Sequence, residues 1–248
     1  VYRSSLESKE LKLFQREAET LKSLNHPLIP RYLDYFELNF QDGKGFGLVQ
    51  TYITGKSLRR FLKSGQTLTE AEAKQIATSV LDLLIYLHEQ SPPIIHRDIK
   101  PSNLLISSHA EQTIGQVHLI DFSSAQNFIA SAKGSFTVVG TYGYTAPEQV
   151  SGRPITASDL YSLGATLLSA MINKDPARLP RKGRRIEFEH LLQCSPAFTE
   201  WLAQMIAPAL DQRFSSAREA LQALENPPRK IAKSSKPKPI DSKIVLTK

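Results

Sequence analysis

The stretch that most constrains this chain is IIHRDIKPSNLLI, at residues 94–106. Its apolar ends are expected to anchor it in a core, and apolar strand candidates lie at 104–106 and 117–120. Between the anchors stand polar and charged side chains, among them those of His96, Arg97, Asp98, Lys100 and Asn103. A polar loop held on a buried support is a common place for functional residues.

Hydrophobic spacing divides the rest of the chain into a small part and a large part. The small part combines a helix over 6–24 with a hairpin over 31–53, whereas the large part is mainly helical. The first long helix of the large part starts at Thr69, where Glu72 completes a capping box. The segment 156–172 is apolar on most sides, which indicates a buried helix. Further helices are expected at 196–206 and at 216–224, the latter with a capping box of Ser216 and Glu219.

Six segments, in this order along the chain, resemble the protein kinase family. They are FQREAETLKSLNHP at 14–27, IIHRDIKPSNLLI at 94–106, DF at 121–122, GTYGYTAPE at 140–148, SDLYSLG at 158–164 and DQRF at 211–214. The resemblance covers residues 1–225 and implies an α+β, two-lobed fold. Its small N-lobe, residues 1–50, would be truncated to a C-helix and a β-hairpin. A hinge at 51–56 would lead to a mainly helical C-lobe at 57–225.

The resemblance implies a Ser/Thr protein kinase that uses ATP and Mg²⁺ on a protein substrate. Asp98 would orient the substrate hydroxyl and accept its proton, and Lys100 would bring positive charge to the transferred phosphoryl group. Asn103 and Asp121 would hold Mg²⁺ through oxygen atoms. Lysine at position 100 is typical of Ser/Thr kinases, and Thr141 matches the family threonine that touches the catalytic loop. Taken singly, each residue also fits a surface loop, and Asn103 a turn; their joint spacing favours the site.

The resemblance also assigns residues around the nucleotide. Leu105 would form the floor of the adenine site, and the backbone of Thr51–Ile53 would hydrogen bond to the adenine edge. Gln50 would stand at the position that gates the back pocket, where a polar side chain is unusual. Glu17 matches the C-helix acid that pairs with the family's ATP-binding lysine.

Other matches concern regulation and architecture. Arg97 would pair with a phosphate on Ser135 or Thr137, although a Ser-rich loop can equally serve solubility. Three residues match architectural positions: Glu148 and Arg213 as a buried ion pair, and Asp159 as the central-helix carboxylate that holds the catalytic-loop backbone.

Ser123 departs from the family pattern, which has glycine after Asp-Phe. Glycine allows backbone angles that other residues rarely adopt, so serine is expected to restrict the turn. Its hydroxyl could bond to nearby backbone. We therefore expect Ser123 to affect conformational switching rather than metal binding.

The family's glycine-rich loop and lysine-bearing strand are expected before the helix at 6–24, and the sequence holds neither there. We interpret the chain as N-terminally incomplete, so that Glu17 lacks its lysine. On its own the chain is expected to be a poor kinase. A pseudokinase or scaffold without catalysis is the alternative, although it would not require Asp98, Lys100, Asn103 and Asp121 together.

Charge is distributed unevenly. Residues 226–248 hold seven Lys/Arg against one Asp, a net of +6, which leaves residues 1–225 with 24 basic and 23 acidic residues. We read 226–248 as a basic tail or linker, so nucleic acid is an unlikely partner for the domain. A nucleic-acid or acidic-membrane binder is a third reading, which rests on this tail alone. The basic segment 178–185 could dock acidic substrates or partners, although a solvated loop is the favoured interpretation.

The cysteine content and the length of the apolar runs bear on where the protein is located. Cys194 is the only cysteine, which fits a reducing compartment, and we expect a cytoplasmic protein. No apolar run has the length of a membrane span, and further domains could lie outside this chain.

Overall fold

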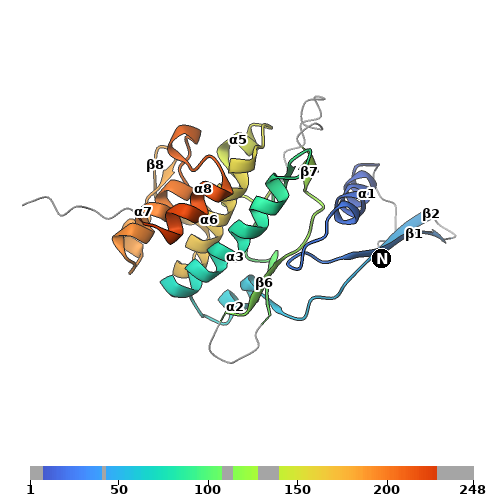
Figure 1. The fold of residues 1–248 in the computed structure, drawn as a ribbon, viewed down its shortest axis with the longest axis horizontal. Helices are drawn as coiled ribbons and strands as arrows, with labels where there is room; N and C mark the ends of the chain where they lie inside the picture. Colours follow the sequence, from blue (N-terminus) through green and yellow to red (C-terminus); the bar gives the residue numbers. More distant parts are fainter. Residues whose placement is uncertain (1–7, 41–42, 108–113, 128–139, 228–248) are drawn as a thin grey trace, which may run out of the picture.

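The chain folds into two unequal lobes, joined by a single extended segment (Figure 1). The computed structural model describes residues 8–40, 43–107, 114–127 and 140–227. The small lobe consists of one helix and a two-stranded sheet, and the large lobe consists mainly of helices. The predicted α+β class is therefore confirmed.

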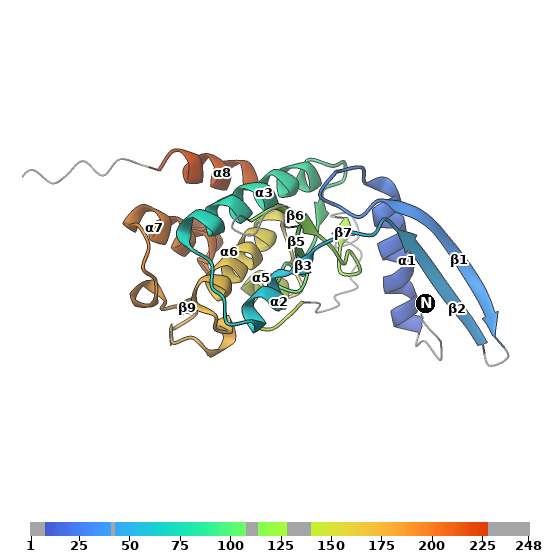
Figure 2. The same cartoon turned by 90° about the horizontal axis from the view of Figure 1, so that it is seen from below.

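The small lobe is built from α1 (Ser8–Ser23), β1 (Tyr32–Phe40) and β2 (Gly43–Gln50). The strands form an antiparallel hairpin that pairs Tyr32 with Gln50, with one irregularity near Asp34. Aromatic contacts join α1 to this sheet, since the ring centroids of Phe14 and Tyr35 lie 5.8 Å apart. Figure 2 shows the hairpin curving alongside α1 and away from the large lobe.

A small sheet lies where the two lobes join. It has three antiparallel strands in the order β3, β5, β6, and β3 leads directly into α2. Ser57 caps α2 by accepting the backbone N–H of Arg60. The elements of this region are β3 (Lys56–Ser57), α2 (Leu58–Lys63), β5 (Leu104–Ser107), β6 (Gln116–Leu119) and the separate pair β4 (Ile94–Ile95) and β7 (Gln126–Asn127).

The core of the large lobe surrounds α6 (Thr156–Ile172), in which every residue from Ala157 to Ala170 is buried. α3 (Glu70–His88), α7 (Pro196–Met205) and α8 (Ala217–Glu225) pack around it. Thr69 and Glu72 cap the start of α3 reciprocally, as predicted. The predicted box at Ser216 is only half formed, because the Glu219 carboxylate accepts the N–H of Ser215 instead.

Short elements complete the large lobe. The segment 178–185, for which the sequence favoured a solvated loop, forms most of a small antiparallel hairpin at 181–186. The elements are α5 (Pro147–Val150), η1 (Pro176–Arg178), β8 (Arg181–Lys182), β9 (Arg185–Ile186), η2 (Glu189–Leu191) and η3 (Leu210–Gln212). Among the described residues, none of the helices has the length and apolar character that a bilayer crossing requires.

Candidate active site

The loop 96–103 lies between two strands whose residues next to the loop are buried. β4 precedes it, β5 follows it, and Ile95, Ile99 and Leu104 are fully buried. The backbone of this loop is also tied to the next strand, because Ile120 N–H donates to the Asn103 carbonyl at 3.0 Å. The sequence thus places its polar side chains on a support that cannot easily shift.

Asp98 lies at the centre of a small polar cluster. Its Oδ2 accepts a hydrogen bond from Lys100 Nζ at 2.6 Å, and its Oδ1 accepts one from Thr141 Oγ1 at 2.9 Å. Lys100 Nζ also donates to Thr141 Oγ1 at 2.9 Å, which closes a ring of three side chains. Two segments far apart in sequence therefore meet at one nearly buried carboxylate, which is 9% exposed.

Asn103 and Asp121 supply oxygen atoms beside this cluster. Asn103 Nδ2 donates to the carbonyl of Asp98 at 2.9 Å, which fixes the orientation of the carboxamide. The backbone bond from Ile120 places Asp121 next to Asn103. The side-chain oxygens of these two residues are suitable ligands for Mg²⁺, which proteins bind through one or two carboxylates or similar groups together with phosphate oxygens and water. Among the described residues, no cluster of three or more His, Cys, Asp or Glu could hold a metal alone.

Asp159 holds the backbone of the loop from inside the large lobe. This fully buried carboxylate accepts the N–H groups of His96 at 2.9 Å and Arg97 at 2.8 Å. It also accepts His88 Nε2 at 3.0 Å, a partner that the sequence did not suggest. Arg97 has φ of 69°, in the left-handed region, and these bonds keep it there.

Glu17 on α1 reaches the same region from the small lobe. The backbone N–H of Phe122 hydrogen bonds to its carboxylate. Burial and, second, the negative charge of Asp121 raise the pKa of Glu17 to about 7. The site therefore includes two carboxylates from opposite lobes that repel one another when both are ionised.

The residues assigned to the nucleotide lie along the connection between the lobes. Thr51 is held by two bonds to Arg31, one from its own N–H and one to its Oγ1. Ile53 is half-buried, and Leu105 in β5 is half-buried opposite His118. Gln50 is exposed at the end of β2, so the apolar surroundings expected for it are absent from the described residues.

The ion pair of Glu148 and Arg213 fixes the segment after the active site. Arg213 Nη1 and Nη2 donate to the two carboxylate oxygens at 2.7 and 3.2 Å, and Nη1 also donates to the Ala157 carbonyl. Ser158 Oγ adds a third donor to Glu148 at 2.7 Å. Neighbouring Gln149 donates to the Arg97 carbonyl at 2.7 Å, a link to the catalytic loop that the sequence motifs did not reveal.

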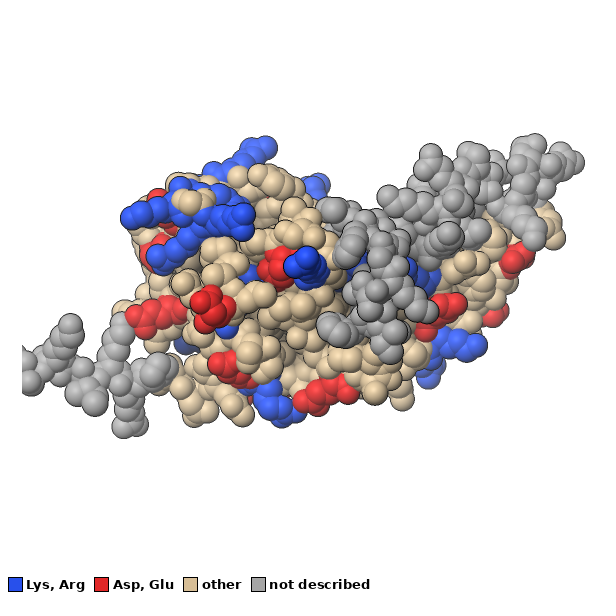
Figure 3. All heavy atoms as spheres, turned by 90° about the horizontal axis from the view of Figure 1, so that it is seen from above, with Lys and Arg blue, Asp and Glu red and all other residues tan. Residues whose placement is uncertain are grey.

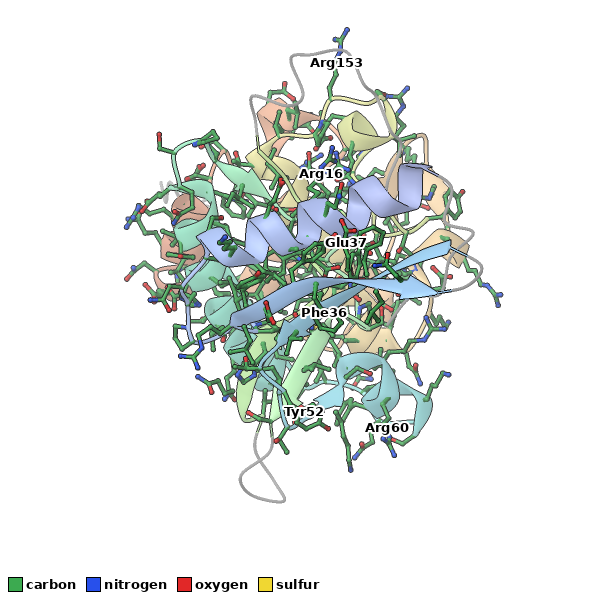
Figure 4. All side chains as sticks on the ribbon, turned by 90° about the vertical axis from the view of Figure 1, so that its right-hand side faces the viewer. Arg16, Phe36, Glu37, Tyr52, Arg60 and Arg153 are labelled. Carbon is green, nitrogen blue, oxygen red and sulfur yellow. The ribbon has the colours of Figure 1, made fainter. Side chains whose placement is uncertain are left out.

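Arg97 of the catalytic loop is buried and feels the charge of Arg16 on α1. Arg97 is 4% exposed, and its Nε donates to the Ser124 carbonyl at 2.7 Å. Burial and, second, the charge of Arg16 lower the pKa of Arg97 to about 10. Figure 4 shows Arg16 at the edge of α1 that faces away from the hairpin residues Phe36 and Glu37. Ser135 and Thr137, the expected phosphate carriers, lie outside the described residues.

Ser123 makes a different contact from the one expected. Its hydroxyl donates to Asp121 Oδ1 at 2.6 Å, a side-chain carboxylate rather than backbone. Asp121 itself has φ of 67°. Phe122 is fully buried and packs edge-on against His96, with ring centroids 4.8 Å apart.

Comparison with known proteins shows which sequences this chain is similar to. The family model described as protein kinase domain matches residues 1–226. Serine/threonine-protein kinase B of Synechocystis sp. is 39% identical, with 87% of this chain and 38% of that protein covered. Serine/threonine-protein kinase PknA of Nostoc sp. is 37% identical, over 86% of this chain and 38% of that protein. Mitogen-activated protein kinase kinase 2 of Arabidopsis thaliana is 32% identical, over 85% of this chain and 59% of that protein.

The chain thus spans about two fifths of the length of the two bacterial relatives. The family match, in contrast, extends over residues 1–226, which is nearly the whole of this chain. Kinases of this family use ATP and Mg²⁺. On the family match and the similarity to Ser/Thr kinases, the chain belongs to the protein kinase family.

Proposed function

We propose that the protein transfers the γ-phosphoryl group of ATP to Ser or Thr hydroxyls of protein substrates. The observation that carries this proposal is the closed ring of Asp98, Lys100 and Thr141. It presents a carboxylate, able to accept a proton, beside a cation, and phosphoryl transfer depends on such positioning more than on covalent chemistry.

In the proposed reaction the substrate hydroxyl oxygen forms a bond to the γ-phosphorus, and the bond from that phosphorus to the bridging oxygen breaks, which releases ADP. The hydroxyl proton passes to the Asp98 carboxylate. Lys100 offsets the negative charge of the transferred group, and Thr141 keeps Asp98 oriented. Bound Mg²⁺, held by Asp121 and Asn103, would neutralise phosphate charge.

Transfer to matched Ser, Thr and Tyr peptides tests this proposal. Enzyme should be in excess over peptide at saturating Mg-ATP, so that a slow rate is still measured. We expect phospho-Ser and phospho-Thr but no phospho-Tyr. Lys100→Met should lower the rate, whereas Lys63→Met, an exposed change on α2, should not. Mg-ATP binding without transfer to any peptide would instead identify a non-catalytic binding module.

We also propose that phosphorylation within residues 131–141 activates the protein. Arg97 bonds to the Ser124 carbonyl, and the charge of Arg16 acts on it, so two cations are available to pair with a phosphate on Ser135 or Thr137. Mass spectrometry of active protein should find phosphate in 131–141. Fully active protein without phosphate there would reject the proposal.

A further inference from the structure

The segment that follows α6 forms a surface hairpin that is anchored to the large lobe by buried side chains. α6 ends at Ile172, its C-cap Asn173 has φ of 49°, and η1 and the β8–β9 hairpin follow. Gly183 makes the hairpin turn with φ of 62°, and a Cβ added there would meet no heavy atom within 4 Å apart from its chain neighbours. Ile186 and Phe188 are buried and anchor the hairpin to the lobe. We call Arg178–Arg185 the basic hairpin.

The basic hairpin concentrates positive charge at the surface. Figure 3 shows these cations gathered at one end of the face, over β8 and β9. Two of them have partners: Arg185 pairs with Glu189, and Arg181 bonds to the Arg184 carbonyl and the Tyr161 phenol. The side chains of Arg178, Lys182 and Arg184 are exposed, and none of them bonds to or pairs with another described residue.

This concentration stands out against the rest of the domain. Residues 1–225 carry almost equal numbers of basic and acidic residues, 24 and 23. Five cations within eight residues, with Glu187 and Glu189 as the acids beside them, therefore form a local rather than a general excess. Guanidinium groups bind carboxylates with paired hydrogen bonds, and clustered charge also steers an oppositely charged partner.

The turn η1, which leads into the basic hairpin, contacts the segment that follows Thr141. Thr141 bonds to Asp98, and Gly143 lies two residues further along the same segment. A Cβ at Gly143 would lie 2.9 Å from both Ala177 N and Asp175 Oδ1, so this turn touches η1. The segment that carries Thr141 and Gly143 therefore runs from the Asp98 cluster to η1, which leads into the basic hairpin.

We propose that the basic hairpin is a substrate-docking surface that selects protein substrates carrying Asp or Glu residues on one side of the phosphorylated hydroxyl. The inference rests on the proposed function and adds the substrate class. Carboxylates of the substrate bind Arg178, Lys182 and Arg184, while the acceptor residue occupies the Asp98 cluster.

Peptide binding tests this directly. Three labelled peptides carry Ala, which cannot be phosphorylated, in the acceptor position. One has Glu residues before this position, one has Glu residues after it, and one has Gln in place of all these Glu residues. Fluorescence anisotropy with the full chain at about 0.15 M salt gives each affinity. One of the acidic peptides should bind more tightly than the Gln peptide. Combined substitution of Arg178, Lys182 and Arg184 by Gln should weaken that peptide roughly tenfold.

A matched variant removes the same charge elsewhere, by Gln at exposed Lys22, Arg60 and Lys63. It should bind the acidic peptide as the unmodified chain does. Equal losses in both variants, or equal affinity for acidic and Gln peptides, would overturn the inference. It would also be overturned if the hairpin variant lost binding to RNA or to phosphatidylserine vesicles but not to the peptide.

Binding requires no phosphoryl transfer, so the two proposals can fail separately. Hairpin-dependent binding without any transfer to Ser peptides would overturn the proposed function and leave the docking surface standing. Transfer with the same kcat/KM for acidic and neutral peptides would leave the proposed function standing and overturn the docking surface.

Discussion

Ser123 shows how one residue can act on the neighbouring metal ligand in two ways. Its Cβ restricts the turn after Phe122, and its hydroxyl donates to Asp121 Oδ1. An ionised carboxylate has about four lone-pair sites, so one donor does not prevent metal binding. Backbone restriction therefore remains the larger expected effect.

Ser123→Gly and Ser123→Ala separate these two effects. Ser123→Gly should increase conformational exchange of the amides of 121–125, because it frees the backbone, whereas Ser123→Ala should leave exchange close to that of the unmodified chain. NMR relaxation dispersion measures the exchange. Mn²⁺ affinity in the presence of nucleotide should change by less than about fivefold in both variants, since one hydrogen bond contributes about 1 kcal/mol. A gain in metal affinity well above tenfold would contradict this account.

Glu17 makes stability depend on pH. Its pKa is about 7 in the fold against the usual 4.5, so the folded state holds a proton that the unfolded chain releases between these values. The group therefore favours folding most at low pH, and this contribution falls as pH rises from 4.5 through 7. The loss reaches at most about 3 kcal/mol by pH 8.

Glu17→Gln keeps the side chain neutral and should remove this loss. Its free energy of unfolding should exceed that of the unmodified chain increasingly from pH 5 to pH 8, as measured by urea denaturation. Glu19→Gln removes an exposed carboxylate from the same helix and controls for net charge. A constant difference across this pH range would show that Glu17 is ionised in the fold throughout.

Among the elements, α5 is held in place by one buried cation, Arg213. Arg213 is fully buried at its side chain and joins Glu148 of α5 to the Ala157 carbonyl of α6. Removing one partner of a buried pair leaves the other charge unpaired, which costs far more than the loss of an exposed pair.

Arg213→Gln should therefore lower the free energy of unfolding by about 3–5 kcal/mol. Arg218→Gln breaks the exposed pair with Glu89 and should cost less than about 1 kcal/mol. Denaturant unfolding of both variants measures the contrast. Similar small losses in both would mean that α5 does not depend on Arg213.

Elements that carry their own signals could be predicted from the sequence. The capping residues of α3 and the apolar period of α6 fix those helices locally. The two-residue strands β3 and β8 have no such signal, because they exist only through pairing with β5 and β9. Likewise, His88, Gln149 and Arg16 join the site through tertiary contacts that no spacing in the sequence indicates.

At the scale of the whole molecule, the candidate site lies where the two lobes meet. The large lobe supplies Asp98, Lys100 and Asn103 on a loop held by Asp159, and the small lobe supplies Glu17 next to Asp121 and Phe122. Spacing and family resemblance indicated these residues in advance. The ring through Thr141 and the contact from Gly143 to η1 required the folded chain.

The central claim is that Asp98 serves the transfer step rather than nucleotide binding. Asp98→Asn should lower single-turnover transfer to a Ser peptide by about 10²–10⁴-fold, since it removes the proton acceptor. The Kd for Mg-ATP should stay within about twofold in the same variant. Asp82→Asn, an exposed change on α3, should alter neither quantity. Transfer by Asp98→Asn at the rate of the unmodified chain would contradict the account.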